Sequence, residues 1–240
     1  MSVTHNATKS VRSNPVAIIA LSLALAFAFG ACKKQGTPEN DDKATQDDTA
    51  TQEDTATPPT GSSSLAEQAG EYSIDTVHSA IVFRVKRADI SYIYGSFHKM
   101  DGTVKLDADP AKSSIEINVD ATKVFSGNAD RDKHLTGPDF LNTEQFPTLT
   151  FKSTAIKAAG EDNQYEITGD LSMNGVTKSV TAMVEHLGGG ANPMNPKGGI
   201  AGFHGTMTIK QSEFNVVYGQ DKGIINDGMD LMISLLLDKK

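Results

Sequence analysis

The sequence predicts an all-β domain, an antiparallel β-barrel of about eight strands with a short helical cover. Three observations lead to this fold class. Apolar and polar residues alternate in eight separate segments, which is the pattern of half-buried strands. Turn signals separate these segments. No helix long enough for a crossover is expected between these segments, so neighbouring strands should run antiparallel, and closing a sheet of this size removes its exposed edges.

The expected strands share a period of two residues. Phe83 and Val85, for example, alternate with Arg84 and Lys86. The eight segments are residues 81–86, 103–107, 115–120, 148–153, 165–171, 176–184, 203–209 and 231–237. Asn174-Gly175 is the strongest hairpin signal, because this dipeptide suits the left-handed turn between paired strands. Residues 188–199, with three consecutive glycines, are expected to form a long flexible loop.

Residues 1–31 are expected to be a lipoprotein signal peptide. Lys9 and Arg12 precede sixteen residues without a charge, and Cys32, the only cysteine of the chain, follows directly. The order Phe29-Gly30-Ala31-Cys32 resembles the lipobox of bacterial lipoproteins, in which the cysteine is acylated. We therefore expect lipidation at Cys32. The alternative is an ordinary secretory signal with an incidental cysteine.

Residues 32–69 are expected to form a disordered acidic tether. They hold seven threonines, eight acids and three lysines, and a Pro-Pro pair is followed by three serines. Such a composition offers too little apolar surface to offset the loss of chain entropy on folding. A partner-binding acidic tail is the alternative. The folded domain should then comprise residues 70–240.

The charge of the chain argues against a nucleic-acid partner. The formal net charge is −8, and the domain has no basic cluster beyond Arg84, Lys86 and Arg87. Proteins that bind nucleic acids usually carry an extended basic surface. With a single cysteine, the chain also cannot form an internal disulfide, so the domain must depend on its own core.

The most charged stretch of the domain, residues 128–142, could be an active site, a metal site or a cover. Asp130 and His134 are four residues apart and would share a helix face, but Asp132 would point away, and two ligands do not complete a metal site. No serine or cysteine nucleophile motif accompanies them. We therefore expect no enzyme, metal or cofactor. A metal-assisted hydrolase using Asp130 and His134 stays as an alternative. Four other histidines are expected to be structural and satisfied by hydrogen bonds: His78, His98, His186 and His204.

The same stretch is consistent with a compact cover that is apolar on the face towards the barrel and charged on the face towards solvent. Asn128 or Asp130 can cap a short helix. Leu135, Phe140 and Leu141 supply apolar contacts, and Arg131 is long enough to reach a nearby carboxylate.

The run from Asn128 to Ser153, NADRDKHLTGPDFLNTEQFPTLTFKS, resembles the signature of the YceI-like family of bacterial secreted lipid-binding proteins. Further matches in order are Tyr72-Ser73-Ile74-Asp75, His78-Ser79 and Asn174-Gly175-Val176-Thr177-Lys178. The resemblance covers essentially all of residues 70–240. It implies a lipocalin-like barrel that binds a long apolar molecule, such as a polyisoprenoid or an isoprenoid quinone.

The candidate ligand-binding residues follow from the alternation and the cover. The expected apolar interior consists of Phe83, Val85, Phe97, Ile117, Phe151, Leu171, Phe203 and Met207, and the cover adds Arg131, His134 and Phe140. The expected function is that of an envelope lipoprotein, anchored in a membrane through Cys32 and facing the periplasm, that carries, stores or sequesters a lipid. Two alternatives stay open: a dry core filled by these side chains, and a ligand-free adaptor. A homodimer is also possible.

Overall fold

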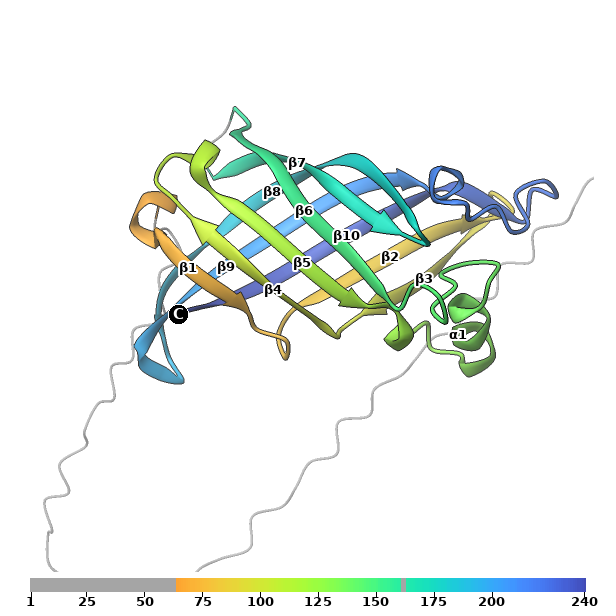
Figure 1. Cartoon of the computed structure of the whole chain (residues 1–240), viewed down its shortest axis with the longest axis horizontal. Helices are drawn as coiled ribbons and strands as arrows, with labels where there is room; N and C mark the ends of the chain where they lie inside the picture. Colours follow the sequence, from red (N-terminus) through yellow and green to blue (C-terminus); the bar gives the residue numbers. More distant parts are fainter. Residues whose placement is uncertain (1–63, 161–162) are drawn as a thin grey trace, which may run out of the picture. The chain divides into compact units, whose positions relative to one another are not determined.

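The computed structural model describes residues 64–160 and 163–240, which form one antiparallel sheet of ten strands (Figure 1). The strands are β1 (Gly70–Ile74), β2 (Ala80–Arg87), β3 (Ser91–Phe97), β4 (Met100–Leu106), β5 (Ser114–Asp120), β6 (Thr148–Ala158), β7 (Gln164–Met173), β8 (Val176–Asn192), β9 (Asn195–Lys210) and β10 (Ile225–Lys239). The helices are α1 (Ala129–Thr136) and four 3-10 turns, η1 (Leu65–Gln68), η2 (Pro110–Lys112), η3 (Ala121–Lys123) and η4 (Gln211–Phe214).

Eight of these strands close into a barrel, which confirms the predicted fold class. Strands β4 to β10 pair in chain order, and β1 joins the two ends by pairing with both β4 and β10. The hairpin of β2 and β3 pairs with β10 farther along the same edge as β1. The sequence pattern missed β1 and β3, because β1 has five residues and the apolar alternation of β3 is interrupted by Gly95.

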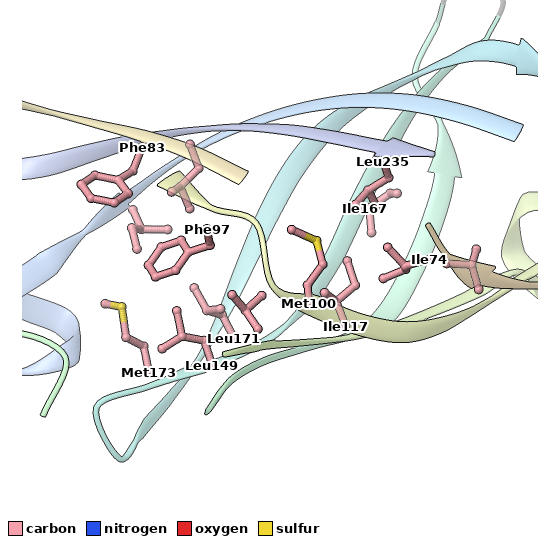
Figure 2. Close-up of a cluster of buried hydrophobic side chains, with 14 of the residues drawn as sticks. Ile74, Phe83, Phe97, Met100, Ile117, Leu149, Ile167, Leu171, Met173 and Leu235 are labelled. Atoms are coloured by element: carbon pink, nitrogen blue, oxygen red, sulfur yellow. The ribbon is translucent and has the colours of Figure 1, made fainter. Parts of the chain in front are cut away.

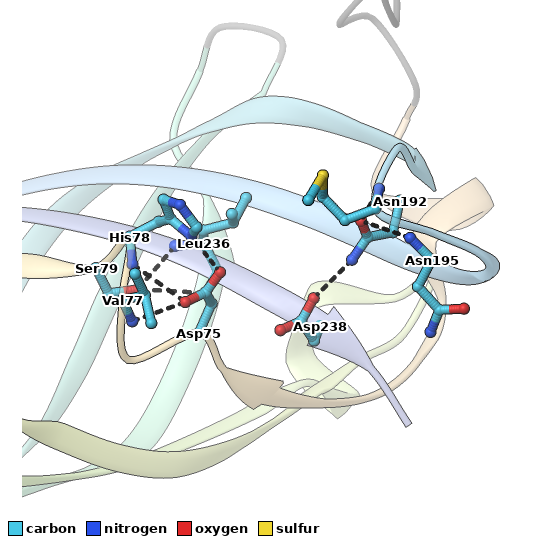
Figure 3. Close-up of polar contacts among 9 residues, drawn as sticks. Asp75, Val77, His78, Ser79, Asn192, Asn195, Leu236 and Asp238 are labelled. Atoms are coloured by element: carbon cyan, nitrogen blue, oxygen red, sulfur yellow. Dashed lines mark hydrogen bonds and ion pairs between the residues drawn. The ribbon is translucent and has the colours of Figure 1, made fainter.

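A hydrogen-bonded turn connects β1 to β2 (Figure 3). The Asp75 carboxylate accepts hydrogen bonds from the backbone N–H groups of Val77 and His78, and lies 2.6 Å from the His78 ring. Burial raises the pKa of Asp75, but the hydrogen bonds from His78 and Val77 outweigh it and hold the pKa below its ordinary value. The buried Ser79 hydroxyl then bonds the backbone of Leu236 in β10, which fills the gap in the strand ladder.

The expectation of a loop over residues 188–199 is wrong, because these residues extend β8 and β9 into one long hairpin. Its tight turn is held by Asn192, whose side chain accepts from the N–H groups of Met194 and Asn195 and donates to Asp238 (Figure 3). A Cβ added at Gly189 would lie 2.7 Å from the Gln68 side chain. This glycine therefore allows η1 to pack closely on β8, which is a packing role rather than a loop role.

The segment before β1 is ordered and closes one end of the barrel. Leu65 and Gln68 of η1 are buried, although residues 64–69 were expected to belong to the tether. The adjoining Tyr72 is fully buried, and its hydroxyl donates to the carbonyl oxygen of Gln68 at 2.7 Å. The folded domain thus begins a few residues earlier than predicted. The signal peptide, Cys32 and the remainder of the predicted tether lie outside the described residues.

The core is a single cluster of apolar side chains inside the barrel (Figure 2). Phe83 and Phe97, from β2 and β3, lie with ring centroids 5.7 Å apart, and Met100, Leu149 and Leu171 of β4, β6 and β7 belong to the same cluster. Within residues 64–160 and 163–240, no helix has the length and apolarity required to cross a membrane.

Candidate ligand-binding cavity

A cavity of about 410 Å³ runs inside the barrel. Side chains from strands β2 to β10 line it, and it extends from Leu65 of η1 to Tyr218 in the loop after η4. Its walls are almost entirely apolar. A cavity of this size and lining is typical of a binding site for a small apolar molecule.

All eight residues predicted for the apolar interior line this cavity. They are Phe83, Val85, Phe97, Ile117, Phe151, Leu171, Phe203 and Met207. For β2, β5, β6, β7 and β9 the alternation therefore gave the correct inward face. The side chains leave space between them, which argues against the dry-core alternative. Whether these residues contact a ligand stays a prediction.

Two glycines on the inner wall determine where aromatic rings lie. A Cβ added at Gly95 would lie 2.2 Å from Cζ of Phe83, and one added at Gly169 would lie 2.5 Å from Cζ of Phe151. The end of each ring thus lies against a neighbouring strand, in space that any other side chain would fill. Because the rings lie against the wall, the middle of the barrel stays open.

The cavity opens at the end of the barrel that carries α1, and we call this end the mouth. Four lining residues are exposed, namely Arg87, His134, Tyr218 and Ile224. At the other end, the lining residues Leu65, Leu106 and Leu237 are buried. Of the four exposed residues, the sequence analysis identified only His134. The others stand at the end of β2 or in the loop before β10, where no alternation indicates direction.

Residues 121–147 lie beside the mouth (Figure 1) and include the predicted cover, residues 128–142; we call the whole segment the cover. Asn128 caps α1 by accepting a hydrogen bond from the backbone N–H of Arg131 at 2.9 Å, as expected. The free edge of β3 joins the cover through a pair of backbone hydrogen bonds between Ser96 and Phe125, 2.7 and 2.9 Å long. The cover therefore closes the side of the barrel that β3 leaves unpaired.

Two charged side chains of the cover form hydrogen bonds with one serine, Ser126. Arg131 donates from Nε to the Ser126 hydroxyl at 2.8 Å and from Nη2 to the Ser126 carbonyl oxygen. The Asp132 carboxylate accepts hydrogen bonds from the backbone N–H and the hydroxyl of the same serine. The expectation that Arg131 reaches a carboxylate is thus not met, because Ser126 stands between the two charges. Arg131 is half-buried and lines the cavity.

His134 stands in an aromatic cluster at the mouth. Its ring lies edge-on to Phe140 and Tyr218, with centroids 4.9 and 4.7 Å away, and its Nε2 is 3.1 Å from Asp139. Phe140, also predicted, lines the cavity. In the part of the chain that the structure describes, no three His, Cys, Asp or Glu residues gather as a metal site would need. His134 is thus held by Asp139 and by rings rather than by Asp130.

One of the predicted structural histidines is not satisfied. His78 and His98 have polar partners, in Asp75 and Ser96. His186, in contrast, is buried, and neither ring nitrogen has a hydrogen bond of good geometry among the described residues, although the nearby Gly188 backbone partly opposes the effect of burial on its pKa. Its ring instead packs on Phe203, with centroids 4.8 Å apart. Burial lowers the pKa of His186, because the charged form would lose its hydration.

The cavity can accordingly surround a long apolar chain and meet a polar group at one end only. The interior supplies few polar atoms, and the buried Gln211 already donates to the carbonyl oxygen of Asn226 at 2.8 Å. At the mouth, Arg87, Arg131, His134 and Tyr218 offer donors.

Residues 72–237 match the YceI-like domain. A protein YceI of Escherichia coli O17:K52:H18 is 39% identical over 170 residues, which cover 70% of this chain and 86% of that relative. A UPF0312 protein of Azotobacter vinelandii is 38% identical over 170 residues, with the same coverage of both chains.

Solved structures resemble the barrel as well. The crystal structure of Burkholderia cenocepacia BcnA has a TM-score of 0.61 and 28% identity, and the likeness covers 68% of this chain and 98% of that chain. A polyisoprenoid-binding domain from Saccharophagus degradans has a TM-score of 0.52 and 15% identity, with coverage of 70% and 98%. At that identity, the second likeness shows the fold alone.

Proposed function

The chain belongs to the YceI-like family, and from this membership and the open apolar cavity we propose that it binds a long apolar lipid inside the barrel. The observation that carries the proposal is the cavity, because an unfilled apolar interior would otherwise be a cost to stability. The ligand class is a polyisoprenoid or an isoprenoid quinone. The Saccharophagus degradans barrel of the same fold is a polyisoprenoid-binding domain, which supports this choice.

The energy of apolar burial is sufficient for such a ligand. Each isoprene unit carries five carbons, and burying one methylene contributes about 0.8 kcal/mol. A few units therefore outweigh the cost of ordering a flexible chain, so affinity can come from the walls alone. Polar donors are needed only at the mouth, where Arg131 and His134 can meet a head group. Such a site favours binding over catalysis.

The test is native mass spectrometry of the protein purified from its own host, followed by solvent extraction of the bound molecule. We expect one long-chain lipid per barrel. In Phe151→Asp the ligand should be lost, because a carboxylate would stand on the cavity wall without a partner. Ala155→Asp, on the solvent side of the same strand, should retain it. An empty parent that also ignores added quinones and polyprenols would refute the proposal and favour the adaptor.

We also propose that the protein is an envelope lipoprotein that faces the periplasm and is anchored by acylated Cys32. The lipobox-like order of residues 29–32 supports this anchoring. Fractionation of host cells tests it: the parent should be in the membrane fraction and incorporate labelled fatty acid. Cys32→Ser should lose both properties. Label incorporation into Cys32→Ser, or a parent that is released without detergent, would contradict the proposal.

A further inference from the structure

The outer surface around the mouth carries several exposed apolar side chains. Large apolar residues with exposed side chains gather on the segments that end there, and we call them the mouth patch: Ile90, Tyr92, Tyr94, Phe125, Val217 and Tyr218. Ile90 is 85% exposed at the tip of the β2–β3 turn. Apolar side chains that cluster on a surface commonly mark a site of interaction.

These side chains come from segments that contact one another. The backbone N–H of Ala88 in the β2–β3 turn donates to the carbonyl oxygen of Ile224, and Asn226 donates to Asp89. Phe125 pairs with β3 through Ser96, and Tyr218 packs on α1 through His134. The patch therefore surrounds the cavity opening on several sides.

The patch is continuous with the inside of the barrel. Tyr218 of the patch and the neighbouring Ile224 are exposed to solvent and also line the cavity. An apolar molecule could therefore leave the cavity along a path that is apolar throughout. A lipid that is released into water would expose its whole chain, at about 0.8 kcal/mol for each methylene. The most favourable destination at this opening is a bilayer.

One exposed cation at the rim also suits a phospholipid surface, although exposed carboxylates such as Asp89 and Asp139 stand nearby. Arg87 is exposed at the mouth, and its side chain has no hydrogen bond or ion pair among the described residues. Its neighbours differ, because Arg84 binds Asp230 and Lys86 binds Asp89. Tyrosine and arginine are well suited to a membrane interface, where an apolar body meets a polar tip and a phosphate.

We propose that the mouth patch docks on a phospholipid bilayer, with the cavity opening against the lipid, so that ligand passes between barrel and membrane without crossing water. The inference rests on the proposed lipid binding. The anchor would permit this orientation, because the chain between Cys32 and Ser64 can span about 100 Å when extended. That reach exceeds the length of the barrel, which is about 50 Å for a strand such as β9.

The chain has no tryptophan, which allows a direct test. Ile90→Trp and Met194→Trp each give the full chain a single fluorophore, at positions that are 85% and 93% exposed. Met194 is in the β8–β9 turn, at the end of the barrel away from α1 (Figure 1). Both variants are reconstituted in phosphatidylethanolamine–phosphatidylglycerol vesicles, with and without brominated phospholipid. Bromine quenches only a fluorophore that enters the acyl region.

We expect the bromine to quench Trp emission in Ile90→Trp and to leave Met194→Trp unchanged. Quenching of Met194→Trp alone, or of neither, would overturn the docking proposal. A blue shift in Ile90→Trp that grows with protein concentration and is insensitive to bromine would mean that a second copy of the chain covers the patch. That result would also overturn it.

A second measurement separates docking from ligand binding. Ile90→Asp/Val217→Asp changes two patch residues that do not line the cavity. Loading with the polyprenol solanesol from vesicles should be at least about tenfold slower, because apolar burial at the membrane is lost, and the final load should be unchanged. Equal loading rates in the parent and the double variant would refute the docking proposal but not the proposed lipid binding. No solanesol in the parent, together with an empty protein from the host, would refute the proposed function.

Discussion

The two ends of the barrel differ in how completely their side chains are covered. At the end with η1, which we call the closed end, Tyr72 and Leu237 are fully buried, and the Tyr72 hydroxyl is satisfied by Gln68. At the mouth, Tyr218 and Ile224 are exposed although they line the cavity. Regions with few buried contacts open at low cost. The comparison indicates that the closed end contributes more to the stability of the barrel than the mouth does, which agrees with the proposed passage of ligand at the mouth.

The largest effect should therefore come from the closed end. Tyr72→Ala removes a fully buried ring, and we expect the free energy of unfolding to fall by about 3–5 kcal/mol. Tyr72→Phe removes only the hydrogen bond to Gln68 and should cost about 1 kcal/mol. Urea denaturation measures both.

Tyr92→Ala is the matched change at the mouth, because Tyr92 is exposed on β3. Its effect on the free energy of unfolding should stay within about 0.5 kcal/mol. A loss comparable with that of Tyr72→Ala would show that stability does not divide between the two ends.

An intermediate and local effect should come from the cover. Ser126→Ala removes the hydroxyl that bonds both Arg131 and Asp132, so the cover should open more often. If the free energy of opening the cover falls by about 1–2 kcal/mol, amide exchange becomes roughly tenfold faster. We expect this change over residues 126–136 only, as measured by hydrogen exchange with mass spectrometry.

Arg131→Ala should reproduce this effect and also lower ligand retention, because Arg131 lines the cavity. The double variant should show less than the sum of the two single effects, since both remove one shared interaction. Strictly additive effects would mean that Ser126 and Arg131 stabilise the cover independently. Unchanged ligand retention and melting temperature in Arg131→Ala would exclude either role for this residue.

The interior of the barrel could be predicted from the sequence, and the rim of the mouth could not. Phe151 and Leu171 face inward because strand alternation leaves only two choices of face, and one of them is apolar. Arg87 and Ile224, in contrast, lie at a strand end and in a loop, where backbone turns set the direction of each side chain. The role of Gly189 could not be predicted either, because its packing against Gln68 depends on a partner far away in the sequence.

The smallest effect on the free energy of unfolding should come from a buried polar side chain away from the mouth. His186 is buried near η1, and its ring nitrogens have no hydrogen bond of good geometry among the described residues. Its pKa is lowered by burial from the ordinary value of 6.5, so below that value the unfolded chain binds a proton that the folded chain refuses. Part of the stability is therefore lost as the pH falls through the region below 6.5, and regained as it rises.

His186→Phe should remove this contribution to the pH dependence and keep the ring packing on Phe203. At neutral pH it should raise the free energy of unfolding by about 1 kcal/mol, because two unsatisfied buried nitrogens are lost. Urea denaturation at about pH 7.5 and about pH 5.5 measures the slope in parent and variant. His186→Leu is the control for the case in which the Phe ring of His186→Phe does not fit the site. If the free energy of unfolding of both variants depends on pH as steeply as that of the parent, the pH dependence originates in other groups. In that case, His186 does not make the closed end sensitive to acid.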